Sequence, residues 1–354
     1  MVVPYVCVRN NPFFICKNIA TQREYMKRNI ALVTGGLSDE SVISYRTAET
    51  IGNNLDKEKY NVYKIDINPE GWFYEDEAGN RSAVDKNDFS VNDKGQKINF
   101  DAVLLAMHGT PGEDGKLQGY FDMLNIPYTG CDAATSAITF NKSYGTGVAR
   151  KGGIHVANSV LLFKHTPVAP ETILQKLKLP FFVKPNNGGS SIGMSKVDEA
   201  GQLPAAIEKA FNVDAAQVLV EEMVQGREFT VGVYKVHGEI ITLPLTEVMK
   251  HESQVFFDFE AKYDGKSDEI TPAQVDETVA EKVREAAKKI YALFNCKGVI
   301  RIDFIYNEEA GEPFMLEVNT IPGQSAASVV PQQVQVAGGN LKDFYTHLVE
   351  ECFV

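Results

Sequence analysis

Charged and amide side chains recur along residues 299–319, which form two short apolar segments around a polar turn. Because residues i and i+2 of a strand share one face, Arg301 and Asp303 are expected to point the same way. Glu317 and Asn319 have the same spacing in the second segment. The oxygens of Asp303, Glu317 and Asn319 would suit Mg²⁺ bridging phosphates, with Arg301 placed to meet developing negative charge. The alternative is two strands with an ordinary salt bridge.

A run of small residues follows directly, NTIPGQSAAS at 319–328. The Pro-Gly turn and the lack of bulky side chains let backbone amides approach a ligand closely. Amides in such a position can stabilise an oxyanion. A plain surface loop is the alternative, but the position directly after the candidate metal ligands favours function.

A glycine- and serine-rich segment, VKPNNGGSSIGMSK at 183–196, begins where an apolar strand ends at Lys184. Flexible backbone amides and hydroxyls can fold over phosphates. The sequence has no Walker P-loop, and the match at Gly145-Thr-Gly147 lacks the third glycine of the dinucleotide motif. A bound nucleotide therefore needs another arrangement, for which Lys184 and its loop are candidates.

Two further polar segments lie in the second half of the chain. Residues 259–273 (FEAKYDGKSDEITPA) predict a mobile lid in which Lys262 reaches a phosphate, the alternative being a solvated loop with incidental charge. The segment VEEMVQGREFT carries Glu221, Glu222 and Glu228. Their carboxylates suit ribose hydroxyls, although two of the three can also be read as simply solvated.

Near the start of the chain, candidate residues follow predicted strands. Glu40 stands in the turn after the first strand, where open α/β sheets bind ligands. A carboxylate there suits an ammonium substrate, or equally a helix start favoured by the macrodipole. His108 follows a later strand in HGTPGEDGKLQG and is a candidate, although a lone histidine is more often structural. Glu113-Asp114-Gly115 in the same segment has the residue types of a turn.

The elements that must position these residues alternate between strands and helices. Strands are predicted at 29–34, 61–67 and 101–109, with a helix from about Ser41 to Leu55, so we expect an open α/β lobe that closes near Gly130.

The remaining elements follow the same signals. A helix is predicted at 141–151, strands at 159–163 and 180–184, and a helix at about 200–211. The segments FTVGVYKV and EIITLPLTEV read as a hairpin that turns at His237-Gly238.

The clearest helix covers 272–294. Thr271 is expected as its N-cap and Pro272 as its first residue, and Gln274 would complete a capping box. An apolar stripe at helical spacing predicts its packing face: Val275, Val279, Val283, Ala286, Ile290 and Leu293.

The composition is ordinary for a globular enzyme, 44% hydrophobic and 23% charged over 354 residues, a length that predicts two or three lobes. A net charge of -12 with no basic run argues against non-specific nucleic-acid binding. Five scattered cysteines without a CxxC pair indicate buried thiols in a reducing compartment. No apolar run approaches the ~20 residues of a membrane span.

The first 25 residues look detached from the rest. They lack sustained periodicity and make a poor signal peptide, whereas Met26 begins MKRNIALVTGG, which reads like a natural start. We interpret 1–25 as a non-native extension from a start codon set too far upstream. A disordered tail or an unusual targeting segment is the alternative.

Together these motifs resemble the D-alanine–D-alanine ligase family of the ATP-grasp superfamily. The matching segments follow the family's order and spacing across residues 35–328: GGLSDESVIS, HGTPGEDGKLQGYFDMLNIPYTG, NKS, VKPNNGGSSIGMSKV, VEEMVQGREFTV, EAKY, RIDF and LEVNTIPGQSAAS. The resemblance implies a three-lobed ATP-grasp fold of α/β class, with an open α/β N-terminal domain (26–131). A central subdomain (132–217) and a C-terminal subdomain (218–354), which carries the metal site and the lid, would grip ATP between them.

The resemblance also implies the residues that bind the nucleotide and its metal ions. Phosphates would contact Lys142, Lys184 and Lys262, the adenine edge Glu221 and Val224, and the ribose Glu228. Two Mg²⁺ (or Mn²⁺) ions would be held by Asp303, Glu317 and Asn319.

The residues implied for the amino-acid substrates come from both ends of the chain. Glu40, linked through Ser190 to Tyr263, would bind the ammonium of the first D-alanine, with His108 as a candidate substrate contact. Arg301 and the Gly323 amide would stabilise the oxyanion, and Ser328 and Val329 would hold the carboxylate of the second D-alanine.

The implied activity is the ATP-dependent joining of two D-alanines through a D-alanyl phosphate, for peptidoglycan synthesis in the cytoplasm. The implied partners are D-alanine and ATP, with no nucleic acid or membrane, and the family suggests a homodimer. Tyr263 in EAKY favours the dipeptide over the D-alanyl-D-lactate depsipeptide, whereas Gln324-Ser325 and Val329 depart from the family's commoner residues beside the second-substrate pocket.

Two alternatives stay open. One is another ATP-grasp carboxylate–amine or carboxylate–hydroxyl ligase, such as a D-alanyl-D-lactate synthetase. The other is a non-catalytic nucleotide-binding module, against which the intact charged residues Arg301, Asp303 and Glu317 argue.

Overall fold

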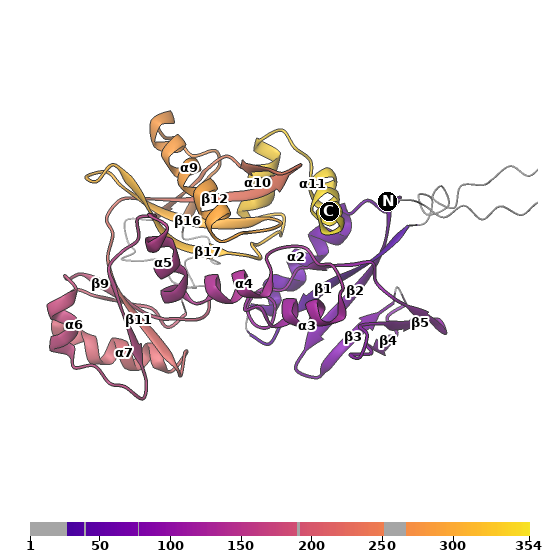
Figure 1. Cartoon of the computed structure of the whole chain (residues 1–354), viewed down its shortest axis with the longest axis horizontal. Coiled ribbons are helices and arrows are strands. Elements are labelled where there is room, and N and C mark those ends of the chain that lie inside the picture. The colour runs from indigo at the N-terminus through magenta and orange to yellow at the C-terminus, as the bar shows by residue number, and fades with distance from the viewer. Residues whose placement is uncertain (1–26, 39, 77, 190–191, 251–266) are drawn as a thin grey trace, which may run out of the picture.

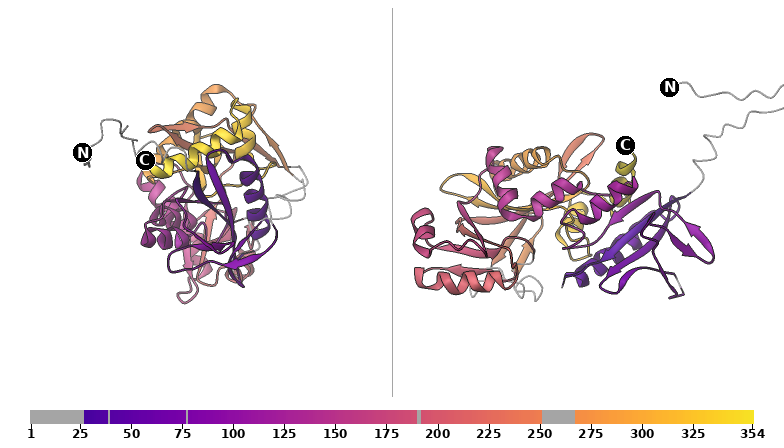
Figure 2. Two further views of the ribbon diagram at one scale, coloured as in Figure 1. Left: turned by 90° about the vertical axis from the view of Figure 1, so that its right-hand side faces the viewer. Right: turned by 60° about the horizontal axis from the view of Figure 1, so that its bottom comes forward.

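The computed structural model describes residues 27–38, 40–76, 78–189, 192–250 and 267–354 (Figure 1). Three main β-sheets organise these residues, each with its own helices. The lobes of the first and second sheets lie at opposite ends of the molecule, and the third sheet lies between them (Figures 1 and 2). The expectation of a mixed α/β chain with three lobes agrees with this arrangement. The expected extension, 1–25, lies outside the described residues.

The first sheet has the strand order β4-β3-β2-β1-β7, with β1 parallel to both β2 and β7. Its strands are β1 (Arg28–Gly35), β2 (Tyr60–Asn68), β3 (Gly71–Glu75), β4 (Arg81–Ala83) and β7 (Ala102–Leu105). The helices of this lobe are α2 (Ser41–Asn54) and α3 (Lys116–Leu124), and β5 (Val91–Asp93) pairs with β6 (Gln96–Ile98). The predicted open α/β lobe is confirmed, although β7 ends at Leu105, earlier than expected.

The parallel pairing of β1 with β7 brings two loops to one edge of this sheet. β1 ends at Gly35, whose φ of +96° is left-handed, and a side chain there would place its Cβ 2.3 Å from the carbonyl oxygen of Ile67. Only glycine therefore fits this exit. The loop carrying Glu40 and the loop carrying His108 start side by side, at the carboxyl ends where such sheets bind ligands.

The second sheet is antiparallel, with the order β10-β9-β11-β8. Its elements are β8 (Ser159–Phe163), α6 (Pro170–Lys176), β9 (Phe181–Pro185), β10 (Ser195–Val197), η1 (Ala200–Gln202), α7 (Leu203–Phe211) and β11 (Gln217–Glu222). Apolar residues of α7 pack on the sheet around Val183 and Val218. The expected boundary at 217/218 is wrong for the sheets, because β11 hydrogen-bonds to β8 and β9 and so belongs to the second sheet.

The third sheet has the order β15-β14-β12-β16-β17, with β13 also paired to β12. Its strands are β12 (Arg227–Val236), β13 (Glu239–Thr242), β14 (Thr246–Lys250), β15 (Ser267–Ile270), β16 (Ile300–Asn307) and β17 (Glu312–Asn319). The hairpin turn at His237-Gly238 is confirmed, with both residues at positive φ. The expected single return strand is instead two, because β13 and β14 pair with different parts of β12.

Helix α9 (Glu277–Leu293) covers one face of the third sheet, and Val283 and Ile290 of the predicted stripe are buried in that core. Its predicted start is wrong. The Thr271 hydroxyl bonds to that of Thr246 at 2.6 Å, and Ala273 N–H donates to the carbonyl of Leu245 at 2.7 Å. These tertiary hydrogen bonds hold the segment against the sheet, so the helix begins five residues later than the capping pattern predicts.

Four helices connect the lobes. Helices α4 (Ala133–Phe140) and α5 (Lys142–Lys151) pack on β17, so they belong with the third sheet rather than with the central segment expected from sequence. After β17 come α10 (Val329–Val336), α11 (Leu341–Glu350) and the short η2 (Glu351–Phe353). Helix α11 packs on α2, and Glu350 accepts hydrogen bonds from Tyr60 at 2.5 Å and Arg28 at 2.8 Å. Among the described residues, no helix has the length and apolar character needed to cross a membrane.

Candidate active site

The four charged and amide residues of the last two strands lie opposite one another. In the antiparallel ladder, Arg301 pairs with Asn319 and Asp303 pairs with Glu317. Directly paired residues project from the same face of a sheet, so the expectation that these four side chains share one face is confirmed. A β-bulge follows Asp303 and leaves Leu316 of β17 without a partner in the ladder, where it lines the site beside Glu317.

Asp303 is the centre of this group. Its Oδ1 accepts from Arg301 Nε at 2.9 Å and from Thr230 Oγ1 at 2.5 Å. Its Oδ2 accepts from Arg301 NH2 at 2.8 Å and from Asn319 Nδ2 at 3.3 Å. Arg301 therefore forms a bidentate pair with Asp303, which fixes both side chains.

The donor set suits a hard cation. Asp303 and Glu317 offer carboxylate oxygens. Asn319 bonds to Asp303 through its side-chain nitrogen, so its amide oxygen is not used in that bond. The described part of the chain contains no cluster of three or more His, Cys, Asp or Glu side chains able to hold a metal. Two carboxylates and an amide still match Mg²⁺, which takes one or two carboxylates and completes its shell with water and phosphate oxygens.

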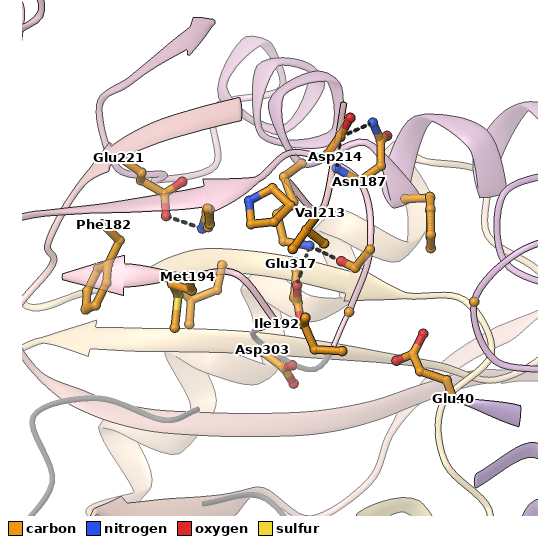
Figure 3. A pocket seen from close by; sticks show the side chains of 18 of the residues that line it. Glu40, Phe182, Asn187, Ile192, Met194, Val213, Asp214, Glu221, Asp303 and Glu317 are labelled. Carbon is orange, nitrogen blue, oxygen red and sulfur yellow. Dashed lines mark hydrogen bonds and ion pairs between the residues drawn. The ribbon is translucent and has the colours of Figure 1, made fainter. Parts of the chain in front are cut away.

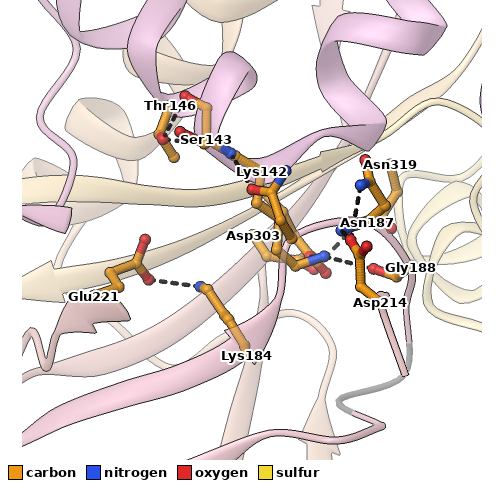
Figure 4. A network of polar contacts seen from close by, with 12 residues as sticks. Lys142, Ser143, Thr146, Lys184, Asn187, Gly188, Asp214, Glu221, Asp303 and Asn319 are labelled. Atoms are coloured by element: carbon orange, nitrogen blue, oxygen red, sulfur yellow. Dashed lines mark hydrogen bonds and ion pairs between the residues drawn. The ribbon is translucent and has the colours of Figure 1, made fainter. Parts of the chain in front are cut away.

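Lys142 meets this face from the first turn of α5. Its Nζ lies 3.3 Å from Glu317 Oε2 and donates to the Gly188 carbonyl at 2.5 Å (Figure 4). The helix starts here because the Asn141 side chain accepts the Tyr144 N–H at 3.0 Å as an N-cap. Lys142 is thus held between the third sheet and the glycine-rich loop.

Lys184 and Glu221 form a third ion pair in the site, and this one is buried. They are diagonal neighbours on β9 and β11, and Lys184 Nζ lies 2.6 Å from Glu221 Oε1 (Figure 4). Their side chains are only 13% and 7% exposed. Such burial limits screening by water, so a phosphate that competes with Glu221 for Lys184 would interact strongly with the ammonium group.

The glycine-rich loop is anchored on one side by Asp214. Asp214 Oδ2 accepts from the backbone N–H and the side-chain amide of Asn187, at 3.0 and 2.8 Å. The loop continues through Gly188, at φ +113°, and Gly189. Ser190, expected to link Glu40 to Tyr263, lies outside the described residues.

A cavity of about 690 Å³ joins these groups, within the range of small-molecule sites. Phe182 and Glu221 lie at one end, Asp303 and Glu317 in the middle, and Glu40 at the other end (Figure 3). Nine of the candidate residues named from sequence line it: Glu40, Lys142, Lys184, Glu221, Glu222, Val224, Glu228, Asp303 and Glu317.

At its far end the cavity narrows around the Glu40 carboxylate. A methyl group added to Gly109 would lie 2.8 Å from Glu40 Oε2, and one added to Gly189 would lie 2.6 Å from Oε1. The carboxylate is therefore flanked by bare backbone from the first lobe and from the glycine-rich loop. A small cation such as an ammonium group has room here only because both flanking residues are glycines.

His108 and Glu113 lie on the loop after β7. His108 is buried and does not line the cavity. Its Nε2 lies 3.0 Å from the Thr47 hydroxyl, and burial together with Arg301 lowers its pKa to about 4. The ring is therefore neutral, which fits a positioning role. Burial and the charge of Glu40 raise the pKa of Glu113 to about 8, so the turn interpretation of Glu113 missed an acid close to Glu40.

The loop after β17 leads into α10. Ser328 is the N-cap residue of α10, its hydroxyl lies 2.7 Å from that of Ser325, and Val329 begins the helix. Gln333 fixes this helix to the third sheet through Gly232 N–H and the Thr230 carbonyl, at 2.9 and 3.0 Å. The N-terminus of α10 is a natural place for a carboxylate.

Gly323 lies in this loop beside Ser328, and a methyl group on it would lie 2.8 Å from the Ser328 hydroxyl. The next residue, Gln324, donates its backbone N–H to the same Thr47 hydroxyl that meets His108, at 3.3 Å. The loop is thereby connected to the first lobe.

The remaining predicted residues, Lys262 and Tyr263, lie outside the described residues. Besides Glu113, sequence reasoning missed Thr230 and Asp214, which hold Asp303 and the glycine-rich loop. Each acts through a contact with a segment distant in the sequence, so no local pattern marked it.

The arrangement, a nucleotide-sized cavity between two antiparallel sheets with lysines and acidic residues facing it, defines an ATP-grasp ligase. Family models described as "D-ala D-ala ligase N-terminus" and "D-ala D-ala ligase C-terminus" match residues 29–131 and 148–350. The chain belongs to the D-alanine–D-alanine ligase family, and it is an ATP-dependent ligase.

Individual relatives agree over nearly their whole length. The D-alanine–D-alanine ligase of Parabacteroides distasonis is 44% identical over 326 residues, covering 92% of this chain and 98% of the relative. That of Flavobacterium johnsoniae is 44% identical over 323 residues, covering 91% and 98%.

Solved structures show the same fold. The VanG D-Ala:D-Ser ligase from Enterococcus faecalis has a TM-score of 0.82 at 30% identity, covering 92% of this chain and 100% of that one. D-alanyl-alanine synthetase A from Vibrio cholerae has a TM-score of 0.82 at 30% identity, covering 92% and 98%. The expected ATP-grasp fold is confirmed.

Proposed function

We propose that the protein condenses two D-alanines into D-alanyl-D-alanine for peptidoglycan synthesis, converting ATP to ADP and phosphate. One observation carries this proposal: the cavity runs without a break from Glu221 and Val224, past Lys142 and Lys184, to the Glu40 carboxylate. A nucleotide and an amino acid bound at its two ends would therefore meet at the phosphates.

The nucleotide end has groups that suit each part of ATP. Phe182, Met223 and Val224 offer apolar surface and backbone groups for adenine, and Glu228 offers a carboxylate for the ribose hydroxyls. The amines of Lys142 and Lys184 offset phosphate charge. Lys262 would add a third amine from the proposed lid.

Asp303, Glu317 and Asn319 would hold two Mg²⁺ (or Mn²⁺) ions. Held by these three residues, a divalent ion would supply positive charge that offsets the charge of the phosphates. The protein's own contribution is to fix the ligands: Arg301 and Thr230 hold the Asp303 carboxylate, and Lys142 holds Glu317.

The chemistry follows from the poor electrophilicity of a carboxylate. Glu40 would bind the ammonium of the first D-alanine, so that its carboxylate points toward the phosphates and attacks the γ-phosphorus of ATP. ADP leaves, and an acyl phosphate forms. The neutral amine of the second D-alanine then attacks the acyl carbon. The C–O bond breaks, and inorganic phosphate leaves with the proton that the amine loses.

Arg301 and the Gly323 amide would stabilise the oxyanion formed in the second step. The second carboxylate would lie at the N-terminus of α10, against Ser328 and Val329. His108 would help to position the loop that carries Gly323, because the Thr47 hydroxyl contacts both His108 and the backbone N–H of Gln324.

Water would hydrolyse the acyl phosphate, so the mechanism requires a cover over the site. We propose that the part of the predicted 250–271 lid between β14 and β15 provides it, with Tyr263 joined through Ser190 to Glu40. The end of that prediction, Ser267–Ile270, is instead strand β15 of the third sheet. Tyr263 would also favour the amine over a hydroxyl as the second nucleophile.

Further expectations belong to the same proposal. The three sheets suggest domains near 26–131, 159–222 and the rest of the chain to 354, with α4 and α5 packed on the last. We expect the enzyme in the cytoplasm, where ATP is available, as a homodimer with small-molecule substrates and no nucleic-acid or membrane partner.

The test measures ADP release with D-alanine alone, L-alanine alone, and D-alanine paired with D-lactate or D-serine. The proposal predicts turnover with D-alanine alone, none with L-alanine, and D-alanyl-D-alanine as the main product in every mixture. A preference for the mixed product would show a different second-substrate specificity. No ADP release with D-alanine would refute the proposal.

A further inference from the structure

Two carboxyl groups approach the same residue, Gly109, at the amino-acid end of the cavity. Glu113 Oε2 accepts the Gly109 N–H at 2.8 Å, and Glu113 N–H donates to the Gly109 carbonyl at 2.8 Å. On its Cα side Gly109 faces Glu40, whose Oε2 would lie 2.8 Å from an added methyl group. Glu113 is therefore fixed close to the carboxylate that faces the substrate, although it has no place in the mechanism so far.

Glu113 is half-buried and has more negative than positive neighbours. Glu40 faces it from the start of α2 and Glu317 from β17, and both repel a second negative charge. Arg301 on β16 and the Gly109 N–H favour the charged form, but they lower the pKa by less than burial and Glu40 raise it. His108, on the same loop, is neutral. Desolvation and the Glu40 charge raise the pKa of Glu113 to about 8.

We propose that Glu113 is a proton-carrying residue of the first-substrate site, neutral while the site is empty, which releases its proton to solvent when an ammonium group binds beside Glu40. This inference rests on the proposed function, because it takes the ammonium of the first D-alanine as the cation that Glu40 binds.

The release follows from charge balance. With Glu113 protonated, the empty site carries one carboxylate at Glu40 rather than two that repel each other. An ammonium bound there stabilises the second carboxylate, so Glu113 becomes a stronger acid and its proton leaves to solvent. By linkage, D-alanine must then bind more tightly as the pH rises toward 8.5. A residue that only closes its own loop would show no such coupling.

The size of the effect depends on how far the ammonium lowers the pKa of Glu113. A shift of about one unit, ordinary for an opposite charge nearby, would release roughly 0.4 proton per D-alanine at pH 7. The same shift would tighten D-alanine binding about threefold to sixfold between pH 6.5 and 8.5.

The experiment is isothermal titration calorimetry of the whole enzyme with Mg²⁺ and β,γ-methylene-ATP, into which D-alanine is titrated at pH 7. Running it in phosphate and in Tris, which differ in ionisation enthalpy, gives the number of protons released. Glu113→Gln keeps the size of the side chain and an oxygen that can accept the Gly109 N–H, but it cannot titrate. Glu58→Gln, an exposed glutamate in the same lobe, is the matched control.

We expect the wild-type protein and Glu58→Gln to release protons alike, and Glu113→Gln to release fewer by roughly 0.4, with affinity that no longer rises with pH. Equal release by wild type and Glu113→Gln overturns the inference.

If Glu113→Gln fails to fold, the wild-type protein alone provides the test. A D-alanine affinity that does not change from pH 6.5 to 8.5 also overturns the inference about Glu113. Binding and turnover of D-alanine without this coupling leave the proposed function intact, whereas a protein that neither binds D-alanine nor releases ADP fails the proposed function first.

Discussion

Replacing Arg301 tests how far the paired strands support catalysis. Arg301→Ala removes a bidentate partner of Asp303 and the side chain proposed to meet the oxyanion. Loss of one oxyanion donor costs about 2.7–4 kcal/mol of barrier, so kcat should fall roughly 10²–10³-fold.

The same substitution should cost less in stability than in rate. Removing one partner of a fully buried pair costs about 3–5 kcal/mol. Here the two side chains are 22% and 13% exposed, and Asp303 keeps its bonds to Thr230 and Asn319. We therefore expect the free energy of unfolding to fall by about 1–3 kcal/mol, the cost of an imperfectly satisfied polar group.

The assay is the rate of ADP release at saturating ATP, Mg²⁺ and D-alanine, alongside urea unfolding of each variant. Arg301→Lys is the matched variant, because it keeps the positive charge and loses the planar fork, so its kcat should lie between those of wild type and Arg301→Ala. A folded Arg301→Ala protein whose kcat stays within threefold of wild type would refute the role of Arg301.

Three further predictions concern other parts of the site. Asn319→Leu should raise the Mg²⁺ concentration for half-maximal activity roughly 10-fold, since it removes an oxygen ligand and a partner of Asp303; an unaltered magnesium titration contradicts the ligand assignment. Lys184→Met should raise the KM for ATP about 10–100-fold, the value of a charge-assisted hydrogen bond of about 1.5–3 kcal/mol; an unchanged KM excludes Lys184 from the phosphate site. Because the pKa of His108 is lowered to about 4, the unfolded chain takes up this proton first. The free energy of unfolding therefore has its full value above pH ~6.5. It falls by about 3 kcal/mol as the pH drops from ~6.5 to ~4. Urea unfolding at pH 7, 5 and 4 should show this loss, and His108→Asn should reduce it; equal acid sensitivity in both proteins would contradict the buried neutral ring.

Local patterns were enough to predict most elements of the fold. The apolar runs at β1, β9 and β16 are buried strands, and the helix predicted at 141–151 and the turn predicted at His237-Gly238 are both present. The failures arise where distant contacts decide. The capping signal at Thr271 is overridden by hydrogen bonds to β14 and its neighbours, and β11 joins the second sheet through pairing that no local pattern reveals.

The candidate site was predictable where chemistry and strand spacing coincide. Arg301, Asp303, Glu317 and Asn319 share a face because alternation within a strand and pairing between strands are both regular. The role of Glu113 could not be read from HGTPGEDG, since its acidity depends on Glu40, 73 residues earlier in the chain. His108 is similar, because its neutral state follows from burial and from Arg301 on another lobe.

The central claim is that one cavity holds the γ-phosphate of ATP against the carboxylate of an amino acid bound at Glu40. Turnover with D-alanine carrying ¹⁸O in both carboxylate oxygens tests it directly, by mass spectrometry of the phosphate released. Attack by the carboxylate on phosphorus predicts one ¹⁸O atom in each phosphate formed. Phosphate without ¹⁸O, released in step with ADP, would show that water takes the phosphoryl group and would contradict the account.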